Sequence, residues 1–352
     1  VVGGGLIGLM LARQLAQKGA SVILFERQEL GRESSWAGGG ILSPLFPWRY
    51  PDELTQLVDW QCGNFQQLAD ELYHETGLDI ELNRCGLHIL NAGDEALALN
   101  WARQNPEGRK SGVLKSDPAD LLKNECLLNR DIDLHSVLTL PGVGSVRNPR
   151  LLKALISSVQ NSQNITLKSH CAVERLIVEG QCVIGVSTEQ GDFFANETII
   201  AAGAWSAPLL QALQVSLPVG PVKGQMLLIK ARPGLLNSVL LTEDCYLIPR
   251  KDGRILVGST LENAGFDKTP TATAKAALLA AAYRWAPALQ QFPIEQQWAG
   301  LRPSSPQGIP FIGPVSGWQG IFLCTGHFRN GVVTAPASVA KIFAVLTLDA
   351  MR

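Results

Sequence analysis

The first 26 residues contain the pattern that most limits what this chain can fold into. Two valines have the character of the end of a buried strand, and glycines follow at the spacing G-x-G-x-x-G. Residues 9–18 then have helical periodicity, and residues 21–26 alternate as a second strand that ends at Glu26. This order predicts a β-α-β unit with parallel strands and a right-handed crossover. The three glycines are Gly3, Gly5 and Gly8.

Each part of this pattern has a physical role in binding a dinucleotide. The first glycine permits a tight turn, the second lets the backbone approach a diphosphate, and the third lets the helix pack on the strand. Leu6 and Ile7 lie in the turn just before the helix, whose free amides and positive dipole end attract an anion. Glu26 can accept hydrogen bonds from both hydroxyls of an adenosine ribose. We interpret Arg27 beside it as a solvated neighbour and not as a reader of a 2′-phosphate.

A second glycine cluster, SSWAGGGI over residues 34–41, lies soon after that acid. Its two hydroxyls can bind a diphosphate, and its glycines let bare backbone lie along a flat ring. A nicotinamide cofactor needs no second platform here, whereas FAD is long and its isoalloxazine ring must be held. The alternative interpretation is a flexible surface loop. The cluster predicts FAD contacts at Ser34, Ser35, Gly39, Gly40 and Ile41.

The length of 352 residues suits two domains. The predicted fold class is α/β, with a Rossmann-type FAD-binding domain built from discontinuous segments and a mainly antiparallel β-sheet substrate domain with helices. The FAD-binding domain is assigned residues 1–77, 135–215 and 295–352. The substrate-binding domain is assigned residues 78–134 and 216–294.

Several individual elements follow from periodicity and turn residues. A long helix is predicted over 53–76 and a helix over 205–213. Short strands are predicted over 78–82 and 86–91, a strand meander over 165–167, 172–179, 182–188 and 192–196, and one strand over 239–249.

Composition excludes several classes of function. The chain has 30 basic and 31 acidic residues and no basic run, which argues against a nucleic acid partner. No apolar run is long enough to predict a membrane span. Seven cysteines occur without a C-x-x-C pair, so we expect reduced thiols in a cytoplasm and no metal site.

Five further segments, in this order along the chain, complete a pattern that covers it nearly from end to end. With them the sequence resembles the D-amino acid oxidase family of FAD enzymes, and within it the members that oxidise glycine. The segments are 31–50 (GRESSWAGGGILSPLFPWRY), 201–206 (AAGAWS), 246–250 (YLIPR), 300–303 (GLRP) and 326–331 (GHFRNG).

The resemblance implies a set of site residues. Arg302, which we expect in a loop, would grip a substrate carboxylate above the flavin, and the Tyr246 hydroxyl would donate to the same carboxylate. Arg329 would line the substrate and the flavin. Relatives that bind flavin covalently have a cysteine just after the arginine, whereas Pro303 follows here, so noncovalent FAD is implied. Further cofactor contacts are implied at Val173, Gly203, His327, Phe328, Arg329, Asn330, Gly331, Val332 and Val333.

The reaction implied is oxidative deamination of glycine through hydride transfer from Cα to flavin N5. The products are an imine, or glyoxylate and ammonia, with hydrogen peroxide formed from oxygen. The family also suggests a homotetramer and a role in making the thiazole of thiamine. Three alternatives stay open: oxidation of sarcosine or small D-amino acids with oxygen or another acceptor, an FAD domain of a larger tRNA-modifying enzyme, and a non-enzymatic FAD-binding subunit.

Overall fold

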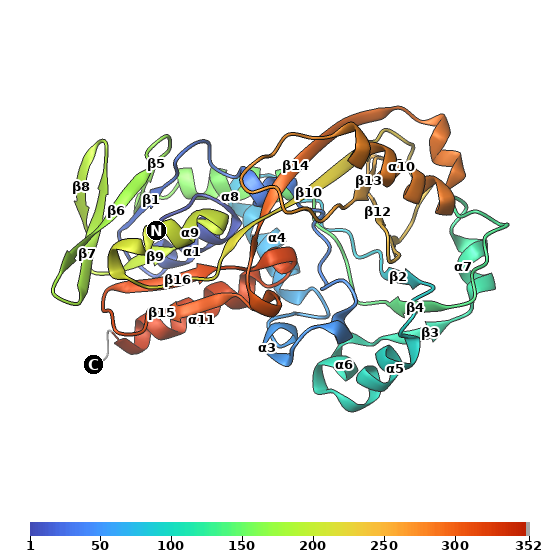
Figure 1. Ribbon diagram of the computed structural model, residues 1–352, viewed down its shortest axis with the longest axis horizontal. Helices are drawn as coiled ribbons and strands as arrows, with labels where there is room; N and C mark the ends of the chain where they lie inside the picture. The colour runs from blue at the N-terminus through green and yellow to red at the C-terminus, as the bar shows by residue number, and fades with distance from the viewer. Residues whose placement is uncertain (350–352) are drawn as a thin grey trace.

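The computed structural model describes residues 1–349, and the chain forms two lobes (Figure 1). The helices are α1 (Leu6–Gln17), α2 (Glu33–Ala37), α3 (Asp52–Thr55), α4 (Gly63–Thr76), α5 (Glu95–Gln104), α6 (Pro106–Ser111), α7 (Pro118–Asn124), α8 (Asn148–Gln160), α9 (Ser206–Leu209), α10 (Ala272–Trp285) and α11 (Ala335–Asp349). The strands are β1 (Val22–Phe25), β2 (Leu87–Leu90), β3 (Leu114–Ser116), β4 (Val137–Leu140), β5 (Ile165–Lys168), β6 (Val173–Glu179), β7 (Cys182–Thr188), β8 (Gly191–Phe194), β9 (Thr198–Ile200), β10 (Gly220–Ile229), β11 (Val239–Leu241), β12 (Tyr246–Pro249), β13 (Ile255–Gly258), β14 (Ile294–Ser304), β15 (Phe311–Pro314) and β16 (Ile321–Thr325). None of the helices within residues 1–349 is long and apolar enough to cross a lipid bilayer.

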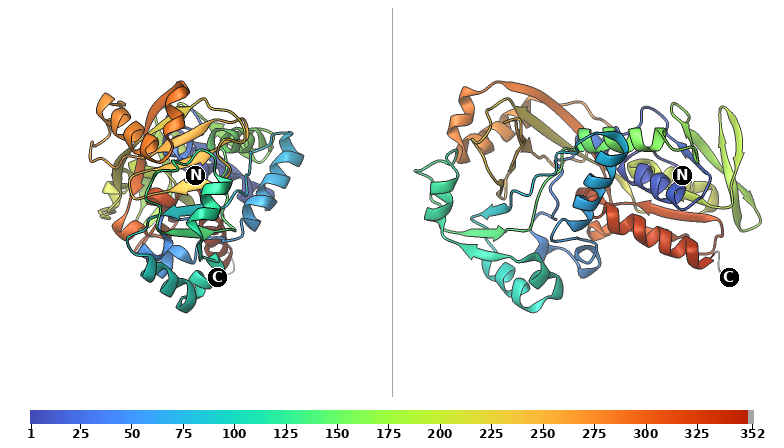
Figure 2. Two further views of the ribbon diagram at one scale, coloured as in Figure 1. Left: turned by 90° about the vertical axis from the view of Figure 1, so that its right-hand side faces the viewer. Right: turned by 180° about the vertical axis from the view of Figure 1, so that it is seen from behind.

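The first lobe contains a mainly parallel sheet assembled from distant parts of the chain. Val2 forms parallel bridges to Phe25 on one side and to Ile200 on the other. Beyond these neighbours, β1 pairs in parallel with β5, and β9 pairs in parallel with β16. The last strand, β15, is antiparallel to β16. Helix α1 packs against α8 and α11, so the predicted Rossmann-type fold is confirmed (Figure 2).

The second lobe is an eight-stranded sheet with the order β14-β10-β13-β12-β11-β2-β4-β3. Every neighbouring pair in it is antiparallel except β11 with β2. Helix α10 packs on β10 and β13 over a separate hydrophobic cluster. Strands β10 and β14 are the longest, and they extend toward the first lobe (Figure 1). Strands β4 and β14 belong to this sheet, although the predicted boundaries at 135 and 295 placed them in FAD-binding segments.

The predicted meander is smaller than expected. Strands β6, β7 and β8 form a three-stranded antiparallel sheet, as predicted. The strand at 165–167 does not belong to it, because β5 pairs with β1 in the parallel sheet. Alternating apolar and polar residues occur both in parallel and in antiparallel sheets. The sequence pattern therefore did not show whether this strand pairs with β1 or with the meander.

The long helix predicted over 53–76 is wrong, because two helices with a turn between them occupy that range. The Asp59 carboxylate accepts hydrogen bonds from the amides of Gln61 and Asn64, at 3.2 and 2.6 Å, and so begins α4. Cys62 has a φ of 56° immediately before α4, which a continuous helix does not permit.

Three other predicted elements are broken by local hydrogen bonds or by proline. Residues 78–82 form no strand, because Asp79 accepts a hydrogen bond from the Glu81 amide at 2.7 Å and folds the backbone into a turn. The strand predicted over 239–249 is two strands, β11 and β12, since Thr242 Oγ1 accepts from the amides that follow it. The helix predicted over 205–213 is a series of short helical turns that includes Pro208 in α9.

Candidate cofactor and substrate site

Two cavities meet at the phosphate-type turn of the first lobe. The arginine cavity contains Arg302 in its wall, and the Glu26 cavity contains Glu26. They share a rim, so together they form one long hollow suited to a ligand with two distant ends. The shared residues are Gly5, Ser34, Ser35, Ala201 and Gly203.

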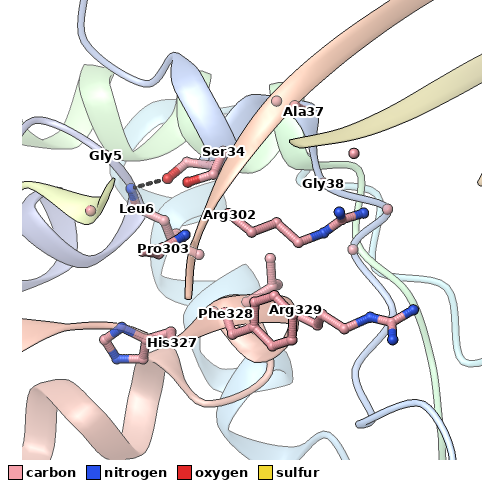
Figure 3. A pocket seen from close by; sticks show the side chains of 18 of the residues that line it. Gly5, Leu6, Ser34, Ala37, Gly38, Arg302, Pro303, His327, Phe328 and Arg329 are labelled. Atoms are coloured by element: carbon pink, nitrogen blue, oxygen red, sulfur yellow. Dashed lines mark hydrogen bonds between the residues drawn. The ribbon is translucent and has the colours of Figure 1, made fainter. Parts of the chain in front are cut away.

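The turn beside the rim has little room for side chains at two of its glycines. Gly3 has a φ of 112°, and a Cβ there would overlap the Ala201 carbonyl oxygen. A Cβ on Gly5 would lie 2.9 Å from Ser35 Oγ, the atom that accepts the Leu6 amide at 2.9 Å (Figure 3). The rim therefore combines bare backbone at Gly5 with the side chains of Ser34 and Ser35 near the N-terminus of α1, where an anion is favoured.

Gly8 packs against the backbone of this turn on the side away from the cavities. It does not line either cavity, and a Cβ on it would overlap the Gly3 carbonyl oxygen. Its place is therefore the close packing of α1 on the turn, which is the role that the spacing predicts for a third glycine.

Glu26 lies in the wall of its cavity with both carboxylate oxygens already in contact with backbone. They accept hydrogen bonds from the amides of Gly4 at 2.8 Å and Gln28 at 2.9 Å. Each carboxylate oxygen has a second lone pair, so the group can still accept from a ligand's hydroxyls. Gly3 and Val173 also line this cavity.

Arg27 is not simply a solvated neighbour. Its guanidinium carbon lies 3.6 Å from the centre of the Trp205 ring, and it forms a 3.2 Å ion pair with Glu33. Both partners line the Glu26 cavity with Arg27. No local sequence pattern predicts the contact between Arg27 and Trp205, because the two residues are nearly 180 positions apart.

The second glycine cluster forms the wall of the arginine cavity. Ser34 and Ser35 belong to the short helix α2, after which Gly38 is extended and Gly40 has a positive φ of 77°. The Ile41 region pairs antiparallel with Ser145, and the Val146 amide donates to the Gly40 carbonyl at 2.9 Å. Gly39, Gly40 and Ile41 all line the cavity. The segment is thus held as part of a strand pair, and the flexible-loop interpretation does not describe it.

Arg302 lies on β14, opposite Val222 of β10, and the expected loop is wrong. Its guanidinium donates to the Thr260 carbonyl at 3.1 Å and to the Ser259 hydroxyl at 2.7 Å. Among residues 1–349 no carboxylate forms an ion pair with it. Burial lowers the pKa of Arg302, and the charge of Arg329 also lowers it. A cation in such a position attracts a carboxylate from outside the chain.

Room for that guanidinium comes from a glycine that the sequence pattern did not identify. A Cβ on Gly224 of β10 would overlap the guanidinium of Arg302. A glycine within a strand often marks the close approach of another group, and Gly224 is such a glycine.

Tyr246 and Arg329 also line the arginine cavity. The Tyr246 hydroxyl is buried and donates to Met226 Sδ at 3.2 Å. Arg329 is exposed, and its side chain extends in the same general direction as that of Arg302 (Figure 3). The structure thus brings all three predicted substrate-contacting residues to one cavity.

The segment between β16 and α11 closes the other side of the arginine cavity. His327, Phe328, Arg329, Gly331 and Val332 line it. Asn330 and Val333 are buried beside it and line neither cavity.

His327 is neutral at physiological pH. It is 3% exposed, its Nε2 shares a 3.1 Å hydrogen bond with Ser338 Oγ, and burial lowers its pKa to about 4. The side chain lies on the far side of the cavity from the two arginines (Figure 3). It is therefore a neutral hydrogen-bonding group near pH 7 and not a charged acid.

This depressed pKa predicts a pH-dependent stability. Between about pH 6.5 and 4 the unfolded chain binds a proton at His327 that the folded chain excludes, so the free energy of unfolding falls as pH falls through this window. In His327→Gln that slope should decrease by up to about 1.4 kcal/mol per pH unit. Urea unfolding across this pH range measures it, with exposed His135→Gln as the control. Equal slopes for His327→Gln and wild type would contradict the prediction.

The residues that line the two cavities fit FAD in their geometry and in the chemistry of their polar groups. Bare backbone and two serines lie at the junction of the cavities, where a diphosphate would be held. The carboxylate of Glu26 lies at one end of the hollow. At the other end, the glycine backbone of residues 38–41 lines the cavity and offers a surface for a flat ring system.

The parallel sheet, the glycine turn and the two-part cavity together define an FAD-dependent oxidoreductase. A family model described as FAD dependent oxidoreductase matches residues 1–346, and the chain belongs to that family. A glycine oxidase of Pseudomonas putida is 45% identical over 349 residues, covering 99% of this chain and 93% of that protein. A glycine oxidase of Pseudomonas aeruginosa is 45% identical over 338 residues, covering 96% and 91%. The crystal structure of a glycine oxidase from Bacillus cereus matches with a TM-score of 0.88 at 28% identity, covering 98% of this chain and 96% of that chain.

Proposed function

We propose that the protein oxidises a small amino acid, with glycine the preferred substrate, to an imine that water converts to glyoxylate and ammonia. The observation that carries this proposal is Arg302, a cation in the cavity wall that forms no ion pair among residues 1–349. The names of the two Pseudomonas relatives, both glycine oxidases, support the choice of glycine.

Substrate binding would begin with the carboxylate. Arg302 is already oriented by Ser259 and Thr260, so little side-chain entropy is lost when it binds. The Tyr246 hydroxyl would exchange its weak sulfur acceptor, Met226, for a carboxylate oxygen. These contacts would direct the Cα of a small substrate into the cavity.

The chemical step needs little acid-base work from this chain. Bound FAD would supply the hydride acceptor, with oxygen as the final oxidant. The substrate must react as the neutral amine, and His327, itself neutral near pH 7, supplies no charged acid for that step. The residues of this chain therefore act by orientation and by charge.

The cofactor would be held without a covalent bond. Pro303 and Ser304 follow Arg302 in β14, so no thiol lies there. Cys324 lines the arginine cavity, but burial raises the pKa of its thiol to about 12, which keeps it protonated and unreactive. All seven cysteines are free, which supports a reducing compartment such as the cytoplasm. Assembly as a homotetramer is part of the proposal, and light scattering of the purified protein tests it.

Gly224 provides a first test of the carboxylate site. In Gly224→Ala the added methyl would displace the Arg302 guanidinium, so we expect kcat/KM for glycine to fall at least tenfold, or about 1.4 kcal/mol, with FAD still bound. Gly220→Ala on the same strand is the matched control, because its Cβ would meet only Ser304 Oγ at 3.9 Å. Steady-state oxygen consumption decides the matter, and equal losses in both variants would refute the steric argument.

An anaerobic titration of the yellow protein with glycine, sarcosine and D-alanine tests the function directly. Bleaching of the flavin absorbance by glycine at the lowest concentration, followed by recovery on admission of oxygen, is the expected result. Bleaching by sarcosine or D-alanine alone would keep the mechanism and change the substrate. If none of the three bleaches the flavin, the proposed activity is wrong and a non-enzymatic FAD-binding subunit is favoured.

A further inference from the structure

Arg250 is a buried cation that the proposed mechanism does not use. It follows β12 directly, it is 8% exposed, and its guanidinium reaches inward to two backbone carbonyls. One terminal nitrogen donates to Val146 and the other to Gly39, both at 2.9 Å. Gly39 lines the arginine cavity, so Arg250 contacts the cavity wall from behind.

These two carbonyls belong to the two strands of one backbone pair. The Val146 amide donates to Gly40, and the Leu42 amide donates to Gly144, both at 2.9 Å. A single planar guanidinium therefore ties both strands together at the level of Gly39. A lysine cannot span both acceptors in one rigid plane.

The charge of Arg250 is balanced by carbonyl dipoles and not by a contacting acid. Among residues 1–349 no carboxylate forms an ion pair with it. The acid that exerts the largest charge effect on it, Glu81, contacts Arg147 and Arg150 instead, both at 3.1 Å. Burial lowers the pKa of Arg250 to about 10, so the group is still charged at neutral pH.

A positive charge placed behind a cavity wall favours whatever negative charge develops in front of it. Two-electron reduction of a flavin creates such a charge when the reduced ring stays deprotonated. This step of the argument rests on the proposed function, since it requires the flavin ring to lie against residues 38–41.

We propose that Arg250 is a positioning residue for the cofactor, which fixes the wall at Gly39 and Gly40 and raises the reduction potential of the bound flavin through its charge. The fork shape and the charge make separate contributions. The two contributions can therefore be separated by two substitutions.

The test measures FAD affinity and the midpoint potential of bound FAD, with no amino acid present. Arg250→Gln removes the charge, and we expect the equilibrium with a reference dye to shift at least tenfold toward oxidised flavin, or about 30 mV for a two-electron couple. Arg250→Lys keeps a charge and loses the fork, so we expect weaker FAD binding by about tenfold and a smaller change in potential. Arg254→Gln is the matched control, because it removes an arginine from the same hairpin that pairs at the surface with Glu295 and Asp252.

Each result bears on the proposal. A potential and an FAD affinity equal to those of wild type in both Arg250 variants would overturn it, as would an equal shift in Arg254→Gln. If Arg250→Gln does not fold, Arg250→Lys alone decides, since unchanged FAD affinity there refutes the positioning role. Because no substrate is used, these outcomes are independent of whether glycine bleaches the flavin.

Discussion

Arg302→Ala should lose most of its activity and keep its FAD. Removing one partner of a desolvated charge pair costs about 2–5 kcal/mol, so kcat/KM for glycine should fall between roughly 30-fold and several thousand-fold. The cofactor should be unaffected, because the guanidinium contacts Ser259 and Thr260 and none of the rim residues. Stopped-flow reduction of the flavin at increasing glycine concentration measures the loss, and flavin absorbance per protein measures retention.

Two further variants give this prediction its controls. Arg302→Lys keeps a cation but cannot form two parallel hydrogen bonds, so its loss should be intermediate. Arg109→Ala removes an exposed arginine on α6, which lines neither cavity, and should have no effect. If turnover in Arg302→Ala equals that of wild type, the carboxylate lies elsewhere, and the exposed Arg329 becomes the first alternative.

Gly5→Val should produce a folded protein without flavin. Gly5 lies on the rim that both cavities share, and its Cβ would already be 2.9 Å from Ser35 Oγ. The two further methyl groups of valine would fill the place of the diphosphate and disturb the hydrogen bond that the Leu6 amide donates to Ser35 Oγ. We expect FAD affinity to fall at least 100-fold, or about 2.7 kcal/mol.

Fluorescence quenching of FAD by the apoprotein measures this loss. Gly93→Val is the matched control, because Gly93 has open space around its Cβ position and lies outside both cavities. Recovery of Gly5→Val with a full complement of flavin would remove the phosphate-turn interpretation of the first eight residues.

The cofactor lobe was predictable because its strongest pattern is local. The turn from Gly3 to Gly8 lies between a strand and a helix. An added Cβ would overlap backbone at Gly3 and Gly8 and would crowd the Ser35 side chain at Gly5. The position of β14 was not predictable in the same way. Its sequence, IEQQWAGLRPS, has no clean alternation, and its strand conformation depends on pairing with β10 and on the packing of Gly300 against Ala37.

The site residues also differ in whether a local sequence pattern identifies them. Arg302 and Tyr246 were found because they lie in short segments that resemble a family, although the loop expected for Arg302 was wrong. The contacts of Arg250 were not found, because they join it to Gly39 and Val146, 211 and 104 residues away. Contacts at such separations depend on how the two lobes pack, which no window of sequence contains.

The order in which the cavity walls are synthesised determines when the cofactor can bind. The phosphate turn is synthesised well before the wall formed by residues 327–332. A nascent chain that still holds those residues inside the ribosome has an arginine cavity open on one side. Tight capture of the cofactor therefore follows the synthesis of residues 327–332, and the apoprotein must persist unaided, or be protected, until they fold into place.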